Sequence, residues 1–222
     1  NYNYKDDDLI CTGMARYDYI NRECVPKKQI LYAPSWRKYL TFSPRASKWE
    51  LQTDKLIQSD YFMGILKFLN NKELSAYLDK NDLELHVKLH PIIAEQGSEL
   101  VSVSCEKIKI LKADMEVKVE EYCAFITDFS SYVFDYACLN RPIMYYVTDY
   151  EQFKSGMNHY KELDLPFEKA FGPLFVNDID VIRYLNYLSE RKYKPEDLYY
   201  HRMEDFFVPL ENCAEKLYER II

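Results

Sequence analysis

The sequence predicts an α/β fold in which helices cover both faces of a parallel sheet. Three consecutive segments carry this prediction: Ala124–Thr127 is a short apolar strand, Ser130–Leu139 a helix, and Pro142–Val147 a second apolar strand. A β-α-β unit joins parallel strands, and strands as apolar as these are typical of a sheet that is buried on both faces.

Further strands are predicted where apolar runs or strict alternation end at a glycine or a proline. They are Leu9–Gly13, Gln29–Pro34, the alternating stretch Leu83–His90, and Ile108–Leu111. Helices are predicted where apolar residues recur at helical spacing, in Leu56–Leu69, Lys72–Leu78, Asp114–Tyr122, Ile179–Leu188 and Asn212–Ile221. Ser35–Lys48 has no clear period and is interpreted as a long loop, a kind of segment that often carries function.

The composition predicts a globular protein without a general affinity for nucleic acid. With 222 residues, 48% of them hydrophobic, the chain has enough apolar side chains for a packed core. We expect residues 1–222 to form one domain. The formal net charge of −7 argues against a basic nucleic-acid surface. A nucleotide ligand stays possible, because backbone N–H groups can hold one phosphate locally.

Cysteine usage and apolar runs predict a reduced, cytoplasmic setting. The six cysteines show no metal-ligand spacing, and the sequence has no Asn-x-Ser/Thr glycosylation site. The longest uninterrupted apolar run, Ile143–Val147, is too short to cross a bilayer. The chain begins at Asn1 without a signal-peptide pattern, and we interpret it as a piece of a larger protein that would supply any membrane attachment.

The most informative stretch is the junction at which a predicted strand turns into a helix. It contains Thr127, Asp128, Ser130 and Ser131. Ligands bind at the carboxyl ends of parallel strands, and the N–H groups of a helix N-terminus attract anions. The junction therefore predicts a phosphate or diphosphate site. The alternative is ordinary helix capping by Asp128 or Ser130, which needs no ligand.

Other polar residues are candidates for the same site. His90 ends a strand and could bind a phosphate oxygen or a ribose hydroxyl, or serve as a structural histidine beside Pro91. Arg37 could clamp a phosphate, although pairing with a carboxylate is the simpler explanation. Asp135 is turned away from the junction and either pairs with a base or ribose or lies on the solvated face. We reject a metal site, since His86 and His90 offer too few ligands.

No glycine-rich dinucleotide fingerprint, Walker loop, metalloprotease motif or nucleophile elbow occurs in the sequence. We therefore expect a phosphorylated donor that binds without a cofactor, a dedicated metal ion or a covalent nucleophile.

Several motifs, read together and in order, resemble the CDP-glycerol:poly(glycerophosphate) glycerophosphotransferase family, which builds teichoic-acid-like polymers. They are Thr12–Asp18, Ile30–Arg37, Lys88–Pro91, Ile126–Tyr136, Leu139–Ile143 and Phe171–Pro173. The resemblance implies a Rossmann-like domain that forms the C-terminal, donor-binding half of a GT-B-type architecture. It also implies an N-terminal domain, absent here, whose histidine acts as the general base.

The implied reaction transfers glycerol phosphate or ribitol phosphate from a CDP-polyol to a hydroxyl of a growing polymer and releases CMP. The implied location is the inner face of the cell membrane. The resemblance gives His90 and Asp128 catalytic roles and places Ser130 and Ser131 among the donor-binding residues, with Arg37, Thr127 and Asp135. Two segments depart from the family pattern, Gly156–Tyr160 and Leu210–Ala214; in the second, Asn212 could still cap the last helix beside a phosphate.

Two other functions are open. One is a GT-B glycosyltransferase domain that uses a nucleotide sugar for a capsule or surface glycan, which a preference for UDP or GDP over CDP would reveal. The other is a non-catalytic module that binds a polymer or a partner protein.

Overall fold

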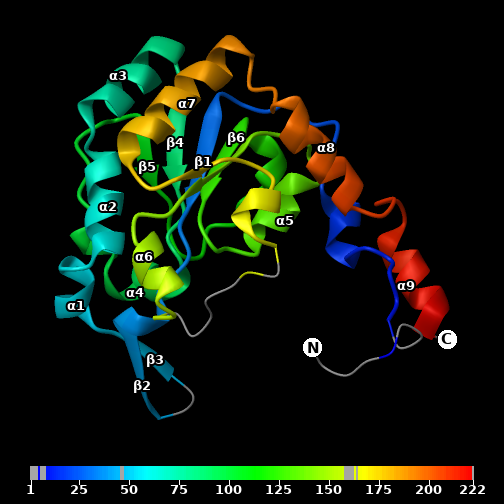
Figure 1. Cartoon of the computed structure of the whole chain (residues 1–222), viewed down its shortest axis with the longest axis horizontal. Helices are drawn as coiled ribbons and strands as arrows, with labels where there is room; N and C mark the ends of the chain where they lie inside the picture. Colours follow the sequence, from blue (N-terminus) through cyan, green and yellow to red (C-terminus); the bar gives the residue numbers. More distant parts are fainter. Residues whose placement is uncertain (1–4, 6–8, 46–47, 158–162, 164, 222) are drawn as a thin grey trace.

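A six-stranded, all-parallel sheet forms the centre of the computed structural model, which describes residues 5, 9–45, 48–157, 163 and 165–221 (Figure 1). From one edge to the other the strands are β5 (Ile108–Ile110), β4 (Glu84–Val87), β1 (Gln29–Ala33), β6 (Ala124–Thr127), β7 (Ile143–Tyr146) and β8 (Leu174–Phe175). The chain adds strands on one side of β1, then returns to add the remaining strands beside β6. This is the Rossmann strand order, and it places the topological switch point between β1 and β6.

Both faces of the sheet are buried, as the apolar strands predict. In β1, Ile30 and Tyr32 belong to one hydrophobic core, while Leu31 and Ala33 belong to the other. Because successive side chains of a strand point to opposite faces, a continuous apolar strand serves two cores at once. The predicted fold class is therefore confirmed.

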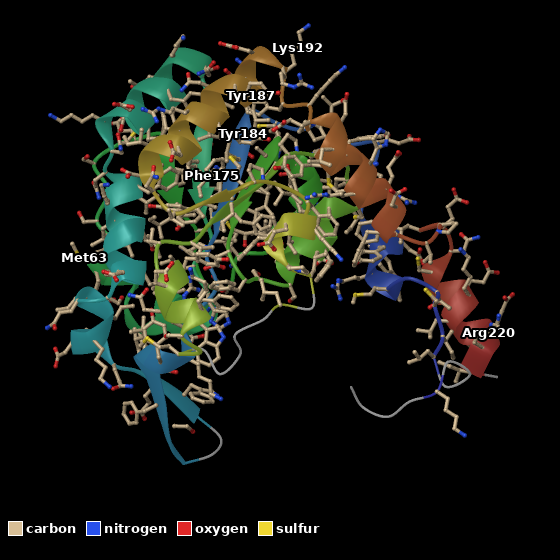
Figure 2. The ribbon with its side chains drawn as sticks, in the orientation of Figure 1. Met63, Phe175, Tyr184, Tyr187, Lys192 and Arg220 are labelled. Carbon is tan, nitrogen blue, oxygen red and sulfur yellow. The ribbon has the colours of Figure 1, made fainter. Side chains whose placement is uncertain are left out.

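One face is covered by helices from the first half of the chain and by α7, which lie together in Figure 1. They are α1 (Thr53–Ile57), α2 (Asp60–Leu69), α3 (Lys72–Asn81), α4 (Pro91–Gln96) and α7 (Asp178–Glu190). The edge strand β8 packs here too: Phe175 contacts Tyr184 of α7, which contacts Tyr187, and Figure 2 shows the three rings close together. Buried faces with polar outer surfaces explain why these helices form.

The opposite face is covered mainly by α5 (Tyr132–Ala137) and α8 (Asp197–Phe206), whose Met203 is fully buried. The N-terminal 3-10 helix η2 (Ala15–Tyr19) packs on this side, next to α9 (Cys213–Ile221). The remaining elements are α6 (Tyr150–Lys154), η3 (Lys38–Leu40), η4 (Ser98–Leu100), η5 (Val119–Glu121) and η6 (Phe167–Lys169). None of the helices in the described residues is long and apolar enough to cross a membrane.

A two-stranded antiparallel hairpin projects from the carboxyl end of the sheet (Figure 1). It consists of β2 (Thr41–Arg45) and β3 (Lys48–Leu51), so the prediction of a structureless loop over Ser35–Lys48 is wrong. The side chain of Gln96 fastens the hairpin to α4, since it accepts the Leu51 N–H at 2.9 Å and donates to the Trp49 carbonyl at 3.4 Å.

Two other predicted elements are wrong. Leu9–Gly13 is not a strand, and Leu9 is 63% exposed, because this segment runs beside α9 rather than beside a sheet edge. Asp114–Tyr122 is not an α-helix. It contains only the 3-10 turn η5, which includes Val119, while β-branched Val117 lies outside any helix or strand.

Candidate functional site

The carboxyl ends of β1, β4 and β6 meet at a cavity of about 210 Å³. It lies at the topological switch point, where open α/β sheets bind their ligands. Strand β1 continues into its lining, β4 leads to the residues around His90, and β6 leads to Ser130. The lining consists of Ala33, Pro34, Ser35, Lys88, Leu89, His90, Pro91, Val117, Ser130 and Tyr132.

A second cavity, of about 190 Å³, lies on the other side of the β6–α5 turn. Ser130 lines both cavities, and Ser131 lines the second. Aromatic and aliphatic side chains form most of the second wall, among them Phe129, Tyr145 and Phe167. A few polar groups in a largely apolar recess are typical of small-molecule sites.

The turn that carries Ser130 and Ser131 leads into a helix shorter than predicted. Helix α5 has only six residues, so its dipole is small. The Ser130 hydroxyl accepts the Tyr132 N–H at 3.2 Å, and the Ser130 carbonyl accepts the Val133 N–H at 3.2 Å. The Ser130 side chain therefore does cap this turn, and its O–H proton remains available to donate to a ligand oxygen.

Arg37 lies beneath this edge of the sheet and is 2% exposed. Its Nε and Nη2 donate to the two oxygens of Asp149, at 2.6 and 2.8 Å, and its Nη1 donates to Asp128 at 2.8 Å. The guanidinium plane also lies over the rings of Tyr61 and Phe129, at 4.3 and 4.8 Å. Burial lowers the pKa of Arg37, but Asp128 and Asp149 more than offset this and hold it well above its ordinary value.

Asp128 fastens the segment after β1 to the segment after β6. One carboxylate oxygen accepts the Ser35 N–H at 2.8 Å and the Phe129 N–H at 2.7 Å, while the other accepts from Arg37. Because Arg37 also binds Asp149, which follows β7, a single buried ion cluster ties together three strand ends. The cluster thus fixes the segment after β6 that carries Ser130.

His90 is half-buried and caps helix α4. Its Nδ1 accepts the Ile92 N–H at 3.4 Å, so in the neutral ring the proton belongs on Nε2. Its ring stacks on Trp36, with centroids 5.7 Å apart. Burial lowers the pKa of His90 from its ordinary 6.5, although the charge of Asp128 acts in the opposite direction. Near neutral pH, His90 is therefore a neutral imidazole with one N–H to donate.

The chain matches a known family over its whole length. The model of the family described as CDP-Glycerol:Poly(glycerophosphate) glycerophosphotransferase matches residues 1–222. The chain belongs to this family.

Individual relatives agree with this assignment. The chain is 26% identical to the minor teichoic acid biosynthesis protein GgaB of Bacillus subtilis (strain 168), over 100% of this chain and 24% of that protein. It is 27% identical to a teichoic acid poly(glycerol phosphate) polymerase of the same organism, over 76% of this chain and 20% of that protein. The chain thus spans about a quarter or less of these two relatives.

Solved structures show the same fold at low sequence identity. A variant of the wall teichoic acid polymerase TagF, soaked with CDPG, superposes with a TM-score of 0.61 at 19% identity, over 97% of this chain and 51% of that one. TagF itself gives a TM-score of 0.54 at 21% identity, over 88% of this chain and 43% of that one.

The structure of this family member brings only some of the predicted residues to the cavities. His90, Ser130 and Ser131 line them. Asp128 also borders the second cavity, but both of its carboxylate oxygens are engaged in the ion cluster. Arg37 does not line either cavity, and its guanidinium is paired with the carboxylates of Asp128 and Asp149. Its geometry therefore matches carboxylate pairing, the simpler of the two explanations that the sequence offers.

The other predicted donor-binding residues lie elsewhere. The Thr127 hydroxyl is fully buried and donates to the Ala33 carbonyl at 2.9 Å, which joins β6 to β1. Asp135 accepts from Nε of Arg16 at 2.5 Å, an ion pair between α5 and η2. The geometry gives each a structural contact within the chain, and their roles in donor binding stay predictions.

The N-terminus of α9 is occupied by a carboxylate from this chain. Asp18 accepts the N–H groups of Cys213 and Ala214, at 2.8 Å each, and the Ala214 and Cys213 N–H groups lower the pKa of Asp18. Asn212 lies just before the helix in the left-handed region, with φ 53°, and is exposed. Because Asp18 takes these N–H groups, a phosphate beside Asn212 would have to displace it. Part of the other departing segment, Gly156–Tyr160, lies outside the described residues.

Sequence reasoning missed Asp149 and Trp36. Asp149 follows the strand that ends in Tyr146, so the carboxyl-end rule applied to Thr127 and Asp128 could have found it. Trp36 lies in the segment interpreted as a loop, and no spacing relates it to His90.

Within the described part of the chain, no group of three or more His, Cys, Asp or Glu side chains could hold a metal ion.

Proposed function

We propose that this chain is the donor-binding part of an enzyme that transfers a polyol phosphate from a CDP-polyol to a hydroxyl of a growing cell-surface polymer and releases CMP. The donor carries glycerol phosphate or ribitol phosphate. One observation supports the proposal most: in a chain that belongs to this family, two cavities flank Ser130 at the switch point of a Rossmann-type sheet.

The reaction is an attack at phosphorus. The acceptor oxygen forms a bond to the phosphorus that carries the polyol, and the bond from that phosphorus to the bridging oxygen breaks. CMP leaves with the electron pair of that bond, and the proton of the acceptor hydroxyl passes to a base. Such a reaction depends on in-line positioning and on donors aimed at the phosphoryl oxygens.

The residues at the cavities suit the donor side of this reaction. His90 presents a neutral N–H, and Ser130 presents a hydroxyl whose oxygen already caps the turn. Each would donate to an oxygen of the diphosphate, where hydrogen bonds to a charged acceptor are strong. Asp128 acts indirectly, by fixing the segments that follow β1 and β6.

The remaining requirements belong to the rest of the protein. The base that deprotonates the acceptor would come from an N-terminal domain outside this sequence, which would also close the cleft over the donor. The polymer acceptor would bind between the two domains. A place at the cytoplasmic face of the membrane, without nucleic-acid partners, fits this assignment, and any membrane contact would be made by the full-length protein.

Calorimetric titration of the chain with a panel of nucleotides tests the proposed class. CDP-glycerol, CDP-ribitol and CMP should bind measurably, and more tightly than UDP or GDP. Tighter binding of UDP or GDP would replace the proposal with a nucleotide-sugar glycosyltransferase. If none of these nucleotides saturates the chain, the proposal of a donor site fails and a non-catalytic module is favoured.

A further inference from the structure

The ammonium group of Lys88 lies inside a cradle of backbone carbonyls. Its Nζ donates to the carbonyl oxygens of Lys112, Ala113 and Met115, at 2.9, 2.8 and 2.6 Å. An ammonium group has three N–H donors, so all three are used within the chain. We propose that Lys88 is a positioning residue of the donor site: it holds the loop of residues 112–118 in the shape that walls the cavity beside Ser130.

The side chain of Lys88 joins two parts of the cavity wall. Its backbone follows β4 and extends the pairing with β1, since the Lys88 N–H donates to the Tyr32 carbonyl at 2.8 Å. Lys88 itself lines the cavity that Ser130 and His90 also line. Its ammonium group reaches past this wall to the loop that connects β5 to η5. One residue thus links the switch-point edge of the sheet to the loop that covers it.

The far end of the loop meets the cavity directly. Val117 lines the cavity, and its carbonyl accepts the Tyr132 hydroxyl at 3.1 Å. Val119, two residues later, is buried in the hydrophobic core. Tyr132 and Val119 therefore hold residues 117–119, whereas the three Lys88 hydrogen bonds hold residues 112–115. Within the described part of the chain, the first half of the loop has one other hydrogen bond, from the Met115 N–H to the Lys112 carbonyl at 3.2 Å. Without Lys88, only this bond would remain there.

A cation that lines a proposed phosphate site could instead bind the phosphate. The contacts of Lys88 favour positioning, because a charge shared among three carbonyl oxygens would have to leave all of them to reach a ligand. One of these contacts also falls in the predicted helix Asp114–Tyr122. The Met115 carbonyl, which a helix would use internally, accepts from Lys88.

Two substitutions separate positioning from direct phosphate binding. Lys88→Met keeps the aliphatic stem in the cavity wall and removes the ammonium group. Lys88→Arg keeps a positive charge that binds phosphate well, but its planar fork cannot direct three N–H bonds at the same cradle. Lys109→Met, at an exposed lysine of the neighbouring strand β5, is the matched control. Thermal unfolding is measured first, to check that each variant is folded.

Hydrogen exchange without nucleotide and titration with CDP-glycerol are then compared across the variants. We expect both Lys88 variants to exchange the amides of residues 112–115 at least about tenfold faster and to bind the donor roughly tenfold more weakly. Lys109→Met should match the unchanged chain in both. Protection of the loop that is unaltered in Lys88→Met, or donor binding retained by Lys88→Arg despite a loosened loop, would overturn the positioning role. This role rests on the proposed donor function, whose own failure would appear as an absence of binding by the unsubstituted chain.

Discussion

At the scale of single residues, charge and burial decide what each polar group can do. Arg37 pairs with Asp128 and Asp149, and all three side chains are 1% exposed. The charge of Arg37 therefore holds strand ends together. His90 and Ser130 keep a donor that their own contacts leave available. The sequence makes Arg37, His90 and Ser130 candidates for one site, but residue type does not separate a structural cation from a ligand-binding one.

Removal of the Arg37 charge should destabilise the chain strongly. Arg37→Met leaves two buried carboxylates without their counter-charge, which costs about 3–5 kcal/mol in comparable clusters. Denaturant unfolding measures the loss. The control Arg183→Met removes a surface pair whose partners are 76% and 44% exposed, and should cost less than ~1 kcal/mol. Equal losses for the two variants would contradict the structural role of Arg37.

Donor binding should take up a proton at His90. In the free chain, burial holds the pKa of His90 below 6.5, so the ring is mostly neutral at pH 6.5. A bound diphosphate favours the imidazolium form and raises this pKa, so affinity should increase as the pH falls from neutrality toward the free pKa. The diphosphate diester stays ionised throughout this range and contributes no proton.

Calorimetry at pH 6.5, in buffers of different ionisation enthalpy, counts the protons taken up. We expect a fraction of one proton for the unsubstituted chain and none for His90→Gln. His201→Gln, at an exposed histidine of α8, should behave as the unsubstituted chain does. Unchanged proton uptake in His90→Gln would exclude His90 as the group that meets the phosphates.

At the scale of elements, local patterns predict the buried strands well and the connections poorly. Strand β6 has the predicted bounds, because a continuous apolar run between polar turns has few alternatives in a buried sheet. The hairpin β2–β3 and the helix α8 were not predicted. Asp114–Tyr122 is not the predicted helix, and near its start the Met115 carbonyl accepts from Lys88, a residue distant in sequence. Tertiary contacts of this kind leave no local pattern.

The close approach of β7 and the segment before β8 requires a glycine. A Cβ on Gly172 would lie 1.9 Å from the carbonyl oxygen of Ile143, a backbone atom that cannot turn aside. Gly172→Ala should therefore destabilise the chain by at least ~2 kcal/mol, measured by denaturant unfolding. At Gly97 an added Cβ meets the end of the Leu51 side chain at 3.1 Å, which can shift. Gly97→Ala should thus cost less, and the reverse order would refute the close-packing explanation.

At the scale of the whole molecule, the strand order and the two cores place one set of polar groups at a single edge. The chain leaves β1 toward one side and returns to β6 on the other, so the segments after these strands border a common cavity. The family match covers all 222 residues, yet the chain covers only 24% of GgaB and 20% of the polymerase. We therefore propose that this chain binds the donor and that the remainder of the protein completes catalysis.

The central claim is that the cavities around Ser130 hold the CDP-polyol, and a paired titration tests it most directly. CDP-glycerol is titrated into the unsubstituted chain, Ser130→Ala and the control Ser189→Ala. The Ser189 hydroxyl donates to the Asn186 carbonyl within α7. We predict that Ser130→Ala binds roughly tenfold more weakly, since one hydrogen bond to a charged oxygen is lost, while Ser189→Ala binds as the unsubstituted chain does. Equal affinities of the unsubstituted chain and a folded Ser130→Ala would contradict the account.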